Sequence, residues 1–224
     1  MPDLNTTLHV DMLRGSKVAN SLPVRLIRAF RRNLYGIEWG NPDVVEPLRY
    51  VRDHYLKPYL TPQHTALEIG PGGGRWTRYM LGFKQIYVVD YYAPLLDELR
   101  KNFKQKHIIP VKNHGTDFPG IPDQSVDFVF SFGTFVHLEP PIIEKYLQNL
   151  RRVIRPTANV VIHYSDMTKI MARENKGFSQ NTPSEMRRMV LNAGYCILEE
   201  DLTTMWHSSI VRFATLDRGP SNAG

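Results

Sequence analysis

The chain has 224 residues, of which 42% are hydrophobic and 22% charged, so it is of single-domain size and can bury a full core. No apolar run approaches the ~20 residues that span a bilayer, and the single cysteine, Cys196, excludes an internal disulfide framework. The formal charge of +6 is modest and too diffuse for a nucleic-acid footprint. We expect a cytoplasmic protein with no transmembrane segment and no nucleic-acid partner.

The first 43 residues are predicted to form a helical extension. Apolar residues recur near helical spacing between residues 21 and 35, and arginines occupy the opposite side. A helix docked on the domain with a solvated basic face is the simpler interpretation, and contact with a membrane surface or an acidic partner is the alternative. The segment 35–47 contains Gly36 and Gly40 as hinge candidates, and it is a candidate lid.

Residues 44–216 are predicted to form the main domain. An amphipathic helix over 44–60 is followed by five short apolar strands, which alternate with helices. The strands are expected at 65–69, 86–90, 107–111, 126–131 and 159–164, and the helices near 74–82, 93–103 and 140–154. Short strands that are apolar on both faces and joined by helices predict a parallel sheet covered on both sides.

The C-terminal part of the domain has a different pattern. A helix is predicted over 184–194, where Gly194 ends it, and strands are predicted over 195–202 and 207–214. Only residues 203–206 separate these strands, which is too few for a helical crossover, so the strands should pair as an antiparallel hairpin. The predicted fold class is α/β, with a doubly wound, mostly parallel seven-stranded sheet and a C-terminal antiparallel hairpin. Residues 217–224 are expected to be a flexible tail.

The stretch Glu68 to Trp76, E-I-G-P-G-G-G-R-W, connects the first strand to the first predicted helix of the sheet. This layout places a ligand against the turn, and glycines allow both close approach and unusual backbone angles. A dinucleotide fingerprint would need glycine where the sequence has Arg75 or Thr77. A carboxylate at Glu68 suits a ligand that carries a cation, such as S-adenosylmethionine with its ammonium and sulfonium groups.

This segment resembles motif I of the class I S-adenosylmethionine-dependent methyltransferases. Two further segments are similar to that family, P-D-Q-S-V-D-F-V at 122–129 and L-R-R-V-I-R-P at 150–156, and Asp90 follows Glu68 by 22 residues. The resemblance covers about residues 45–215. It implies a Rossmann-like fold with S-adenosylmethionine as the methyl donor and S-adenosylhomocysteine as the product. Thr157 and Ala158 depart from the usual glycine pair, which concerns turn geometry more than chemistry.

The resemblance also implies which residues bind the cofactor. Asp90 should accept the ribose hydroxyls, and His114 or Asp117 could meet the adenine amino group. Ser131 and Phe132 should touch the methionine part. The predicted cofactor residues are Glu68, Gly70, Pro71, Gly72, Gly74, Trp76, Asp90, Tyr91, Asn113, His114, Thr116, Ser131 and Phe132.

Methyl transfer to a hydroxyl requires a general base at the carboxyl ends of the strands. The candidates for a catalytic role are His137 and Glu139 after the fourth strand and His163 at the end of the fifth. A Mg2+ ion held by histidines, carboxylates and a sugar diol is an alternative way to lower a hydroxyl pKa, and the metal ligands are left unknown.

The acceptor is predicted from looser motifs. The segments F-V-H-L-E, H-Y-S-D and G-F-S-Q-N-T-P-S-E-M resemble the branch of the family that methylates sugar hydroxyls. This implies O-methylation of a glycan, a glycolipid or a glycosylated natural product. N-methylation of a small amine, or another natural-product methyltransferase, is the alternative enzyme, and a non-catalytic S-adenosylmethionine-binding protein is the alternative of another class. The partner is then a small-molecule or saccharide acceptor, and a homo-oligomer is left open.

Overall fold

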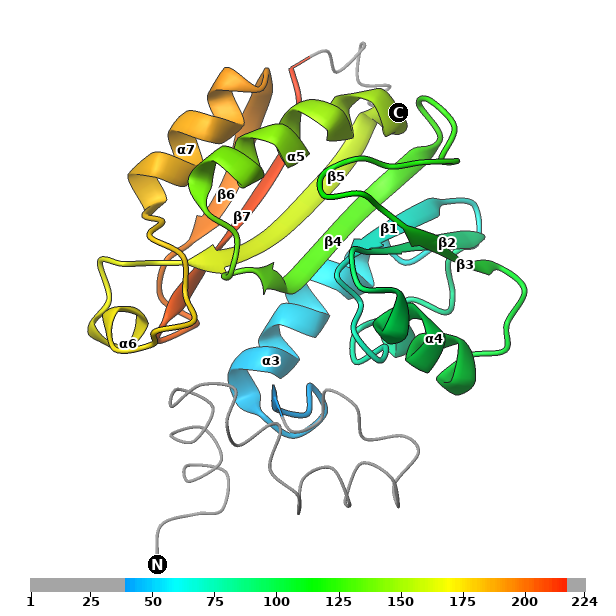
Figure 1. Cartoon of the computed structure of the whole chain (residues 1–224), viewed down its shortest axis with the longest axis horizontal. Coiled ribbons are helices and arrows are strands. Elements are labelled where there is room, and N and C mark those ends of the chain that lie inside the picture. Colours follow the sequence, from blue (N-terminus) through cyan, green and yellow to red (C-terminus); the bar gives the residue numbers. More distant parts are fainter. Residues whose placement is uncertain (1–38, 217–224) are drawn as a thin grey trace, which may run out of the picture.

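The computed structural model describes residues 39–216, which form a seven-stranded sheet with helices on both faces (Figure 1). The strand order is β3-β2-β1-β4-β5-β7-β6; neighbours from β3 to β5 pair parallel, and β7 is antiparallel to both β5 and β6. The predicted fold class and the C-terminal hairpin are therefore confirmed. The strands are β1 (Thr65–Ile69), β2 (Gln85–Asp90), β3 (Ile108–Lys112), β4 (Val126–Phe135), β5 (Ile154–Ser165), β6 (Tyr195–Asp201) and β7 (Ser208–Thr215).

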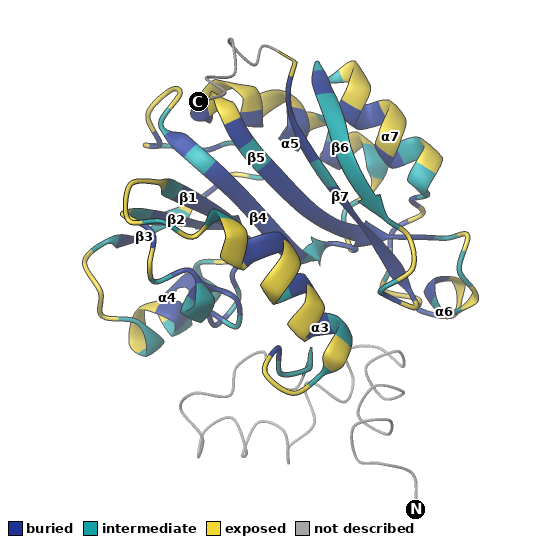
Figure 2. Ribbon diagram, turned by 180° about the vertical axis from the view of Figure 1, so that it is seen from behind, coloured by how far each residue is buried: buried dark blue, intermediate teal, exposed yellow. Residues whose placement is uncertain are grey.

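Two hydrophobic clusters separate the faces of the sheet. On one face α5 (Pro140–Val153) and α7 (Pro183–Asn192) pack on strand residues that include Leu67 and Ile69. On the other face α3 (Glu46–Tyr50) and α4 (Ala93–Asn102) share a cluster with Ala66, and α3 lies in front of the sheet in Figure 2. Because apolar residues on both faces of the central strands are buried, the sheet is a middle layer, as the sequence predicts.

The direction of β7 decides which of its residues lie at the edge of the sheet where the parallel strands end. In the antiparallel pair of β5 and β7, Ser165 at the carboxyl end of β5 is opposite Ser208 at the amino end of β7. The carboxyl ends of β1, β2, β4 and β5 lie at this same edge. The turn between β6 and β7, residues 202–207, therefore joins the loops that follow the parallel strands.

The predicted helix over 44–60 is present in three forms. The helix α3 continues as a π-helix over Val51–Leu56 and ends in a 3-10 turn over Lys57–Tyr59. Its apolar side, Leu48, Val51, Tyr55 and Leu56, is buried against the sheet. Glu199 of β6 accepts hydrogen bonds from His54 Nε2 at 2.7 Å and from the Tyr55 hydroxyl at 2.9 Å, which fixes the helix to the sheet.

The helix predicted near 74–82 was wrong. After the glycines the chain forms turns and then a 3-10 helix of three residues, Thr77–Tyr79. Gly72 and Gly74 have φ of +55° and +102°, which a right-handed helix does not allow. Consecutive glycines also lose more backbone entropy in a helix than other residues, so the sequence favours a turn here.

Part of the predicted organisation lies outside the described residues. The basic helix of residues 21–35, most of the 1–43 extension and the tail 217–224 belong to it, so these predictions stand untested. Within residues 39–216, none of the helices is both long and apolar enough to cross a membrane.

Candidate active site

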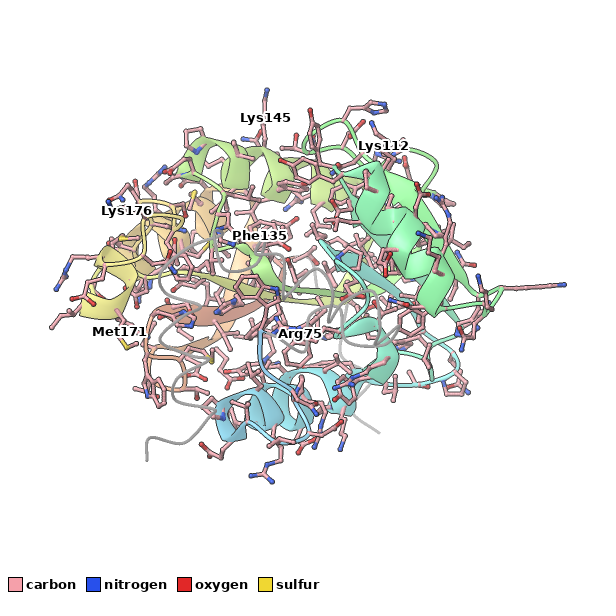
Figure 3. All side chains as sticks on the ribbon, turned by 60° about the horizontal axis from the view of Figure 1, so that its bottom comes forward. Arg75, Lys112, Phe135, Lys145, Met171 and Lys176 are labelled. Carbon is pink, nitrogen blue, oxygen red and sulfur yellow. The ribbon has the colours of Figure 1, made fainter. Side chains whose placement is uncertain are left out.

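The glycine loop lies at the carboxyl edge of the sheet, between β1 and the 3-10 turn. Figure 3 brings this edge forward, with Arg75 near the centre of the view. Gly70, Gly72 and Gly74 all have positive φ, which confirms the predicted need for unusual backbone angles. The loop is held from below, since Gly70 N donates to the Val89 carbonyl at 2.8 Å, and it closes on itself through Gly74 N and the Pro71 carbonyl at 3.0 Å.

Two of these glycines are also required by the packing of the chain itself. A Cβ on Gly70 would come within 1.9 Å of Thr134 Oγ1, and one on Gly74 within 2.1 Å of Phe103 Cε2. From the sequence, the space beside these glycines is predicted to be needed by a ligand. At Gly70 and Gly74, side chains of the chain itself occupy that space, and Thr134 is a neighbour of the loop that the sequence did not reveal.

Glu68 lies beneath the loop and is almost fully buried. Its Oε2 accepts a hydrogen bond from Thr77 Oγ1 at 2.5 Å. Burial raises the pKa of this carboxyl to about 7, and nearby Asp90 raises it further while Thr77 and Arg75 oppose the change. A cationic ligand would stabilise the ionised form of this buried carboxyl and lower its pKa.

Asp90 ends β2, directly beside β1, and is buried. Burial raises the pKa of its carboxyl, although the backbone N–H groups of Tyr92 and Tyr91 oppose this, and Tyr92 N lies 2.8 Å from Oδ1. Tyr91 is half exposed and its ring lies 5.9 Å from Lys112 Nζ. Glu68 and Asp90 thus lie at the carboxyl ends of adjacent strands, at one edge of the sheet.

The three residues predicted on the adenine side have different environments. Asn113 is fully buried; its Nδ2 donates to the Tyr146 hydroxyl at 2.8 Å, and in the described part of the chain its Oδ1 accepts no hydrogen bond. His114 is exposed and pairs with Asp117 Oδ2 at 3.1 Å. Thr116 accepts hydrogen bonds from Asn149 through its carbonyl and hydroxyl oxygens. Of these three residues, only Asn113 is bonded to the end of β2, because its backbone N–H donates to the Asp90 carbonyl.

The end of β4 faces the glycine loop. Ser131 is buried and donates to the Ile69 carbonyl at 2.8 Å. The register of β4 against β5 is irregular between Ser131 and Phe135, and Gly133 has φ of +89°. Phe132 therefore projects at a bulge. Trp76, predicted as a cofactor residue, is buried in the core 4.7 Å from Phe132 between ring centroids, and its Nε1 has no hydrogen-bond partner among residues 39–216.

His163 is buried at the end of β5 with both ring nitrogens engaged. Nδ1 accepts from Gly133 N at 3.1 Å, and Nε2 lies 2.5 Å from Ser208 Oγ. Burial lowers its pKa well below the usual value, and the positive charges of Arg75 and Lys169 lower it further. The ring is therefore neutral, and neither ring nitrogen is open to a proton from a methyl acceptor in this arrangement.

His137 has the opposite character, because it is exposed and engaged on one side only. Its Nδ1 lies 2.7 Å from the Gly177 carbonyl, which can only accept, so the proton is on Nδ1 and the lone pair on Nε2. Within residues 39–216 nothing donates to that Nε2. Phe178 packs edge-on to the imidazole, with ring centroids 5.7 Å apart.

The segment 175–181 holds His137 in place. Ser179 N donates to the Val136 carbonyl at 2.8 Å, and Gln180 N donates to Glu139 Oε2 at 3.2 Å. Its other side is tied to β5, because the Ser165 hydroxyl donates to the Ser179 carbonyl at 2.9 Å. Glu139, a predicted catalytic residue, thus contacts this segment. The segment 167–183 contains α6 (Ile170–Arg173), and Ser179 N ties it to the residue after β4.

Arg75 is a site residue whose position the sequence did not indicate. Its guanidinium carbon lies 5.6 Å from the ring centroids of both Trp76 and Phe132, and Nη1 donates to the Trp39 carbonyl at 2.5 Å. Arg78 makes a similar contact, from Nη2 to Asn41 Oδ1 at 2.7 Å. Two arginines of the turn after the glycine loop therefore hold residues 39–41, part of the candidate lid, against that turn.

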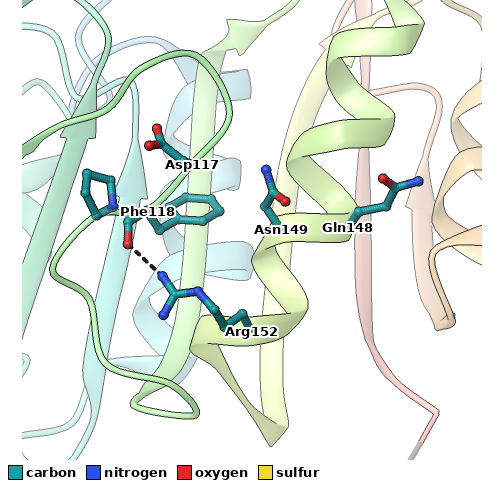
Figure 4. Close-up of a pocket in the computed structure, with 6 residues that line it drawn as sticks. Asp117, Phe118, Gln148, Asn149 and Arg152 are labelled. Carbon is teal, nitrogen blue, oxygen red and sulfur yellow. Dashed lines mark hydrogen bonds between the residues drawn. The ribbon is translucent and has the colours of Figure 1, made fainter.

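The described residues 39–216 contain no metal site. Among residues 39–216, no group of three or more His, Cys, Asp or Glu side chains could hold a metal ion, so nothing in this range supports the Mg2+ alternative. A hollow of about 370 Å³ lies between α5 and the loop before β4, lined by Asp117, Phe118, Pro119, Gln148, Asn149 and Arg152 (Figure 4). Arg152 donates to the Phe118 carbonyl across it, so its charged group is already engaged.

The described residues form an α/β domain with a glycine loop at the carboxyl edge of its sheet, and comparison with known proteins finds the same fold. Residues 66–157, from β1 into β5, match the family model described as a methyltransferase domain. No curated protein matches the chain. The fold and this match support a class I S-adenosylmethionine-dependent methyltransferase.

Solved structures share the fold at low sequence identity. A methyltransferase from Aquifex aeolicus is 22% identical with a TM-score of 0.58, covering 76% of this chain and 94% of that one. A Mesorhizobium loti methyltransferase is 11% identical with a TM-score of 0.65, covering 77% and 99%. The CcbJ methyltransferase of Streptomyces caelestis is 16% identical with a TM-score of 0.62, covering 80% and 99%. These likenesses concern the fold alone.

Proposed function

We propose that the chain transfers the methyl group of S-adenosylmethionine to a hydroxyl of a small molecule, with a sugar hydroxyl as the preferred acceptor and His137 as the general base. The observation that carries the proposal is the tautomer of His137. Its Nδ1 proton is committed to the Gly177 carbonyl, and its Nε2 lone pair is exposed at the end of β4. An imidazole fixed in this way can take a proton from a hydroxyl at neutral pH.

The cofactor residues are assigned from their places at the edge of the sheet. Glu68 and Asp90 lie at the carboxyl ends of β1 and β2, Gly72 lies in the loop between these strands, and Ser131 and Phe132 lie where the register of β4 against β5 becomes irregular. When bound there, S-adenosylmethionine supplies an electrophilic methyl group. The buried Glu68 carboxyl favours its cationic part, and Asp90 offers an acceptor to the ribose hydroxyls.

In the proposed reaction His137 Nε2 removes the proton of the acceptor hydroxyl as the oxygen of that hydroxyl forms its bond to the methyl carbon. The bond from the methyl carbon to sulfur breaks, and S-adenosylhomocysteine leaves. The 175–181 segment orients the imidazole, because the Gly177 carbonyl fixes the ring and the bonds of Ser179 and Gln180 fix the segment. Glu139 acts through this segment and not as the base. His163, with both nitrogens engaged, acts as a positioning residue.

The test is to replace His137 with Ala. We expect turnover to fall by about 10² to 10⁴, the usual contribution of a general base, while S-adenosylhomocysteine still binds with wild-type affinity. The exposed His64 replaced by Ala is the matched control. The acceptor would come from thermal-shift screening of sugars and glycolipid head groups in the presence of S-adenosylhomocysteine, followed by mass spectrometry.

The alternatives predict different results. An amine acceptor needs desolvation more than a base, so near wild-type turnover in His137→Ala would favour N-methylation. Tight cofactor binding without methylation of any acceptor would favour a non-catalytic S-adenosylmethionine-binding protein. A thermal shift with NAD but none with S-adenosylhomocysteine would overturn the cofactor assignment itself.

A further inference from the structure

A tight turn after α6 holds the imidazole of His137. Residues 175–178 form this turn, in which Phe178 N donates to the Asn175 carbonyl at 3.0 Å. Within the turn, Gly177 N donates to Asn175 Oδ1 at 3.1 Å. Asn175 therefore holds two successive N–H groups, one through its side chain and one through its carbonyl. Asparagine favours this geometry because its side chain can accept from the backbone two residues further on.

The turn is fixed at both of its ends. Asn175 is only 8% exposed, and its backbone N donates to the carbonyl of Ala172 in α6 at 3.0 Å. Beyond the turn, Ser179 N donates to the Val136 carbonyl after β4, and the Ser179 carbonyl accepts from Ser165 Oγ of β5. The backbone of the turn is thus bonded to α6 and to the ends of two strands.

Asn175, Gly177 and His137 converge at one point of this turn. A Cβ placed on Gly177 would lie 3.5 Å from Asn175 Oδ1 and 4.0 Å from His137 Nδ1. The peptide unit between Gly177 and Phe178 accepts the His137 Nδ1 proton on its oxygen and donates its N–H to the Asn175 carbonyl. Because hydrogen bonds in series polarise one another, each of these two bonds strengthens the other.

The tautomer of His137 is the property that the turn controls. A neutral histidine side chain in water carries its proton more often on Nε2, and in a protein the hydrogen bond of one ring nitrogen decides the tautomer. The imidazole of His137 is exposed, and among residues 39–216 its one hydrogen bond is to the Gly177 carbonyl. The position of this single oxygen therefore decides whether Nε2 has the lone pair that a general base needs.

We propose that Asn175 is a positioning residue for the general base: it fixes the peptide between Gly177 and Phe178, and this peptide fixes His137 as the Nδ1–H tautomer. This inference rests on the proposed function and adds to it a residue outside the predicted catalytic set. A serine–histidine–aspartate triad orients its imidazole with a carboxylate, whereas here a neutral backbone carbonyl has that role. Asn175 acts on the reaction only through the imidazole of His137.

The first experiment uses the wild-type chain and needs no acceptor. ¹⁵N NMR of the full chain labelled at histidine, assigned with His137→Gln, reports which ring nitrogen carries the proton. We expect Nδ1–H at His137 at pH 8, and slow hydrogen exchange at the amides of Gly177 and Phe178. A proton on Nε2 of His137 would overturn the proposal, and so would exchange of both amides at the rate of exposed backbone.

The second experiment changes Asn175. Asn175→Leu keeps the approximate shape of the side chain and removes the oxygen that Gly177 N–H needs, so we expect His137 to shift toward Nε2–H. Asn175→Asp keeps an acceptor oxygen and should retain Nδ1–H. Asn192→Leu, at the exposed end of α7, is the matched control. The wild-type tautomer in Asn175→Leu would refute the proposal, as would its loss in folded Asn175→Asp.

The third experiment measures turnover once an acceptor is known. We expect Asn175→Leu to lower kcat about tenfold while the acceptor KM stays within about twofold, because the base is misplaced and the acceptor still binds. S-adenosylhomocysteine affinity should not change, and Asn175→Asp should restore most of kcat. A raised KM with unchanged kcat would contradict the positioning role. If the tautomers are as expected and no hydroxyl is ever methylated, the proposed function fails while the effect of Asn175 on His137 stands.

Discussion

The imidazole of His163 lies flat against the ring of Phe132, with centroids 3.9 Å apart and planes only 7° from parallel. The same imidazole accepts the N–H of the next residue, Gly133. One side chain of β5 therefore fixes both the ring and the backbone of the β4 bulge. Since the bulge faces the glycine loop, the shape of this edge of the sheet depends on His163 staying neutral and in place.

Replacing His163 with Phe should keep the stacking and remove both hydrogen bonds. We expect the free energy of unfolding at pH 8 to fall by about 1–3 kcal/mol, the cost of leaving the buried Gly133 N–H unpaired. Because the pKa of His163 is lowered in the folded protein, its contribution to stability is present above the unfolded pKa of about 6.5 and is lost as pH falls below that value. Urea unfolding from pH 8 to 5 measures both effects. A variant with wild-type stability at every pH would contradict this role.

Glu68 should impose the opposite pH dependence. Its pKa rises from 4.5 in the unfolded chain to about 7 in the folded protein, so its stabilising contribution is complete below pH 4.5 and is lost as pH rises toward 7. The loss is on the order of 3 kcal/mol. We expect Glu68→Gln, which can still accept from Thr77, to be more stable than wild type at pH 8, with a difference that shrinks toward pH 5. A pH-independent difference in urea unfolding would show that Glu68 does not titrate in this range.

Gly70 and Gly120 form a matched pair for testing the glycine loop. Their φ values are +71° and +72°, but a Cβ would meet Thr134 only at Gly70, whereas nothing lies within 4 Å at Gly120. We expect Gly120→Ala to cost about 1–2 kcal/mol of unfolding free energy from backbone strain alone, and Gly70→Ala to cost more. Adding Thr134→Ala to Gly70→Ala should recover the excess. Equal losses in the two single variants would mean that Thr134 does not restrict the loop.

Asp90 should contribute to cofactor affinity more than to folding. Asp90→Asn keeps the shape of the side chain and removes the charge, so we expect S-adenosylhomocysteine to bind about 10- to 100-fold more weakly, as for a lost charged hydrogen bond. Asp97→Asn on the exposed side of α4 is the control. Isothermal titration calorimetry measures the affinity, and an unchanged Kd in Asp90→Asn would remove it from the ribose site.

The fold could be predicted because its signals are local. Apolar runs of five or six residues predicted β1 and β2 within one residue of their observed bounds, and the short distance between 202 and 207 predicted the hairpin. The prediction of a helix after the glycine loop was wrong because it followed the general order of strand, turn and helix. The entropic cost of consecutive glycines in a helix outweighs that order here. For β4 and β5 the pattern marked only the apolar centre of a longer strand.

The site was predictable only where a residue ends a strand. Glu68 and Asp90 follow this rule, whereas β4 continues beyond Ser131 to Phe135, and the role of these residues in a cofactor site stays a prediction. Contacts between distant segments have no such signal. The pairing of Gly70 with Thr134, the contact of Arg75 with Trp39 and the approach of Ser208 to His163 depend on how β1, β4, β5 and β7 are ordered in space. Which histidine is open to an acceptor also follows from tertiary contacts, because His137 and His163 look alike in sequence.

The reversed direction of β7 has a consequence for how such a protein can diversify. Residues 202–207 lie at the same edge of the sheet as the glycine loop. In the strand order, β4 and β5 lie between this turn and the strands that carry Glu68 and Asp90. Insertions or exchanges in this turn can therefore reshape the acceptor side while the glycine loop keeps its backbone. Under the proposed function, a library confined to the hairpin turn would vary acceptor choice against a constant methyl donor.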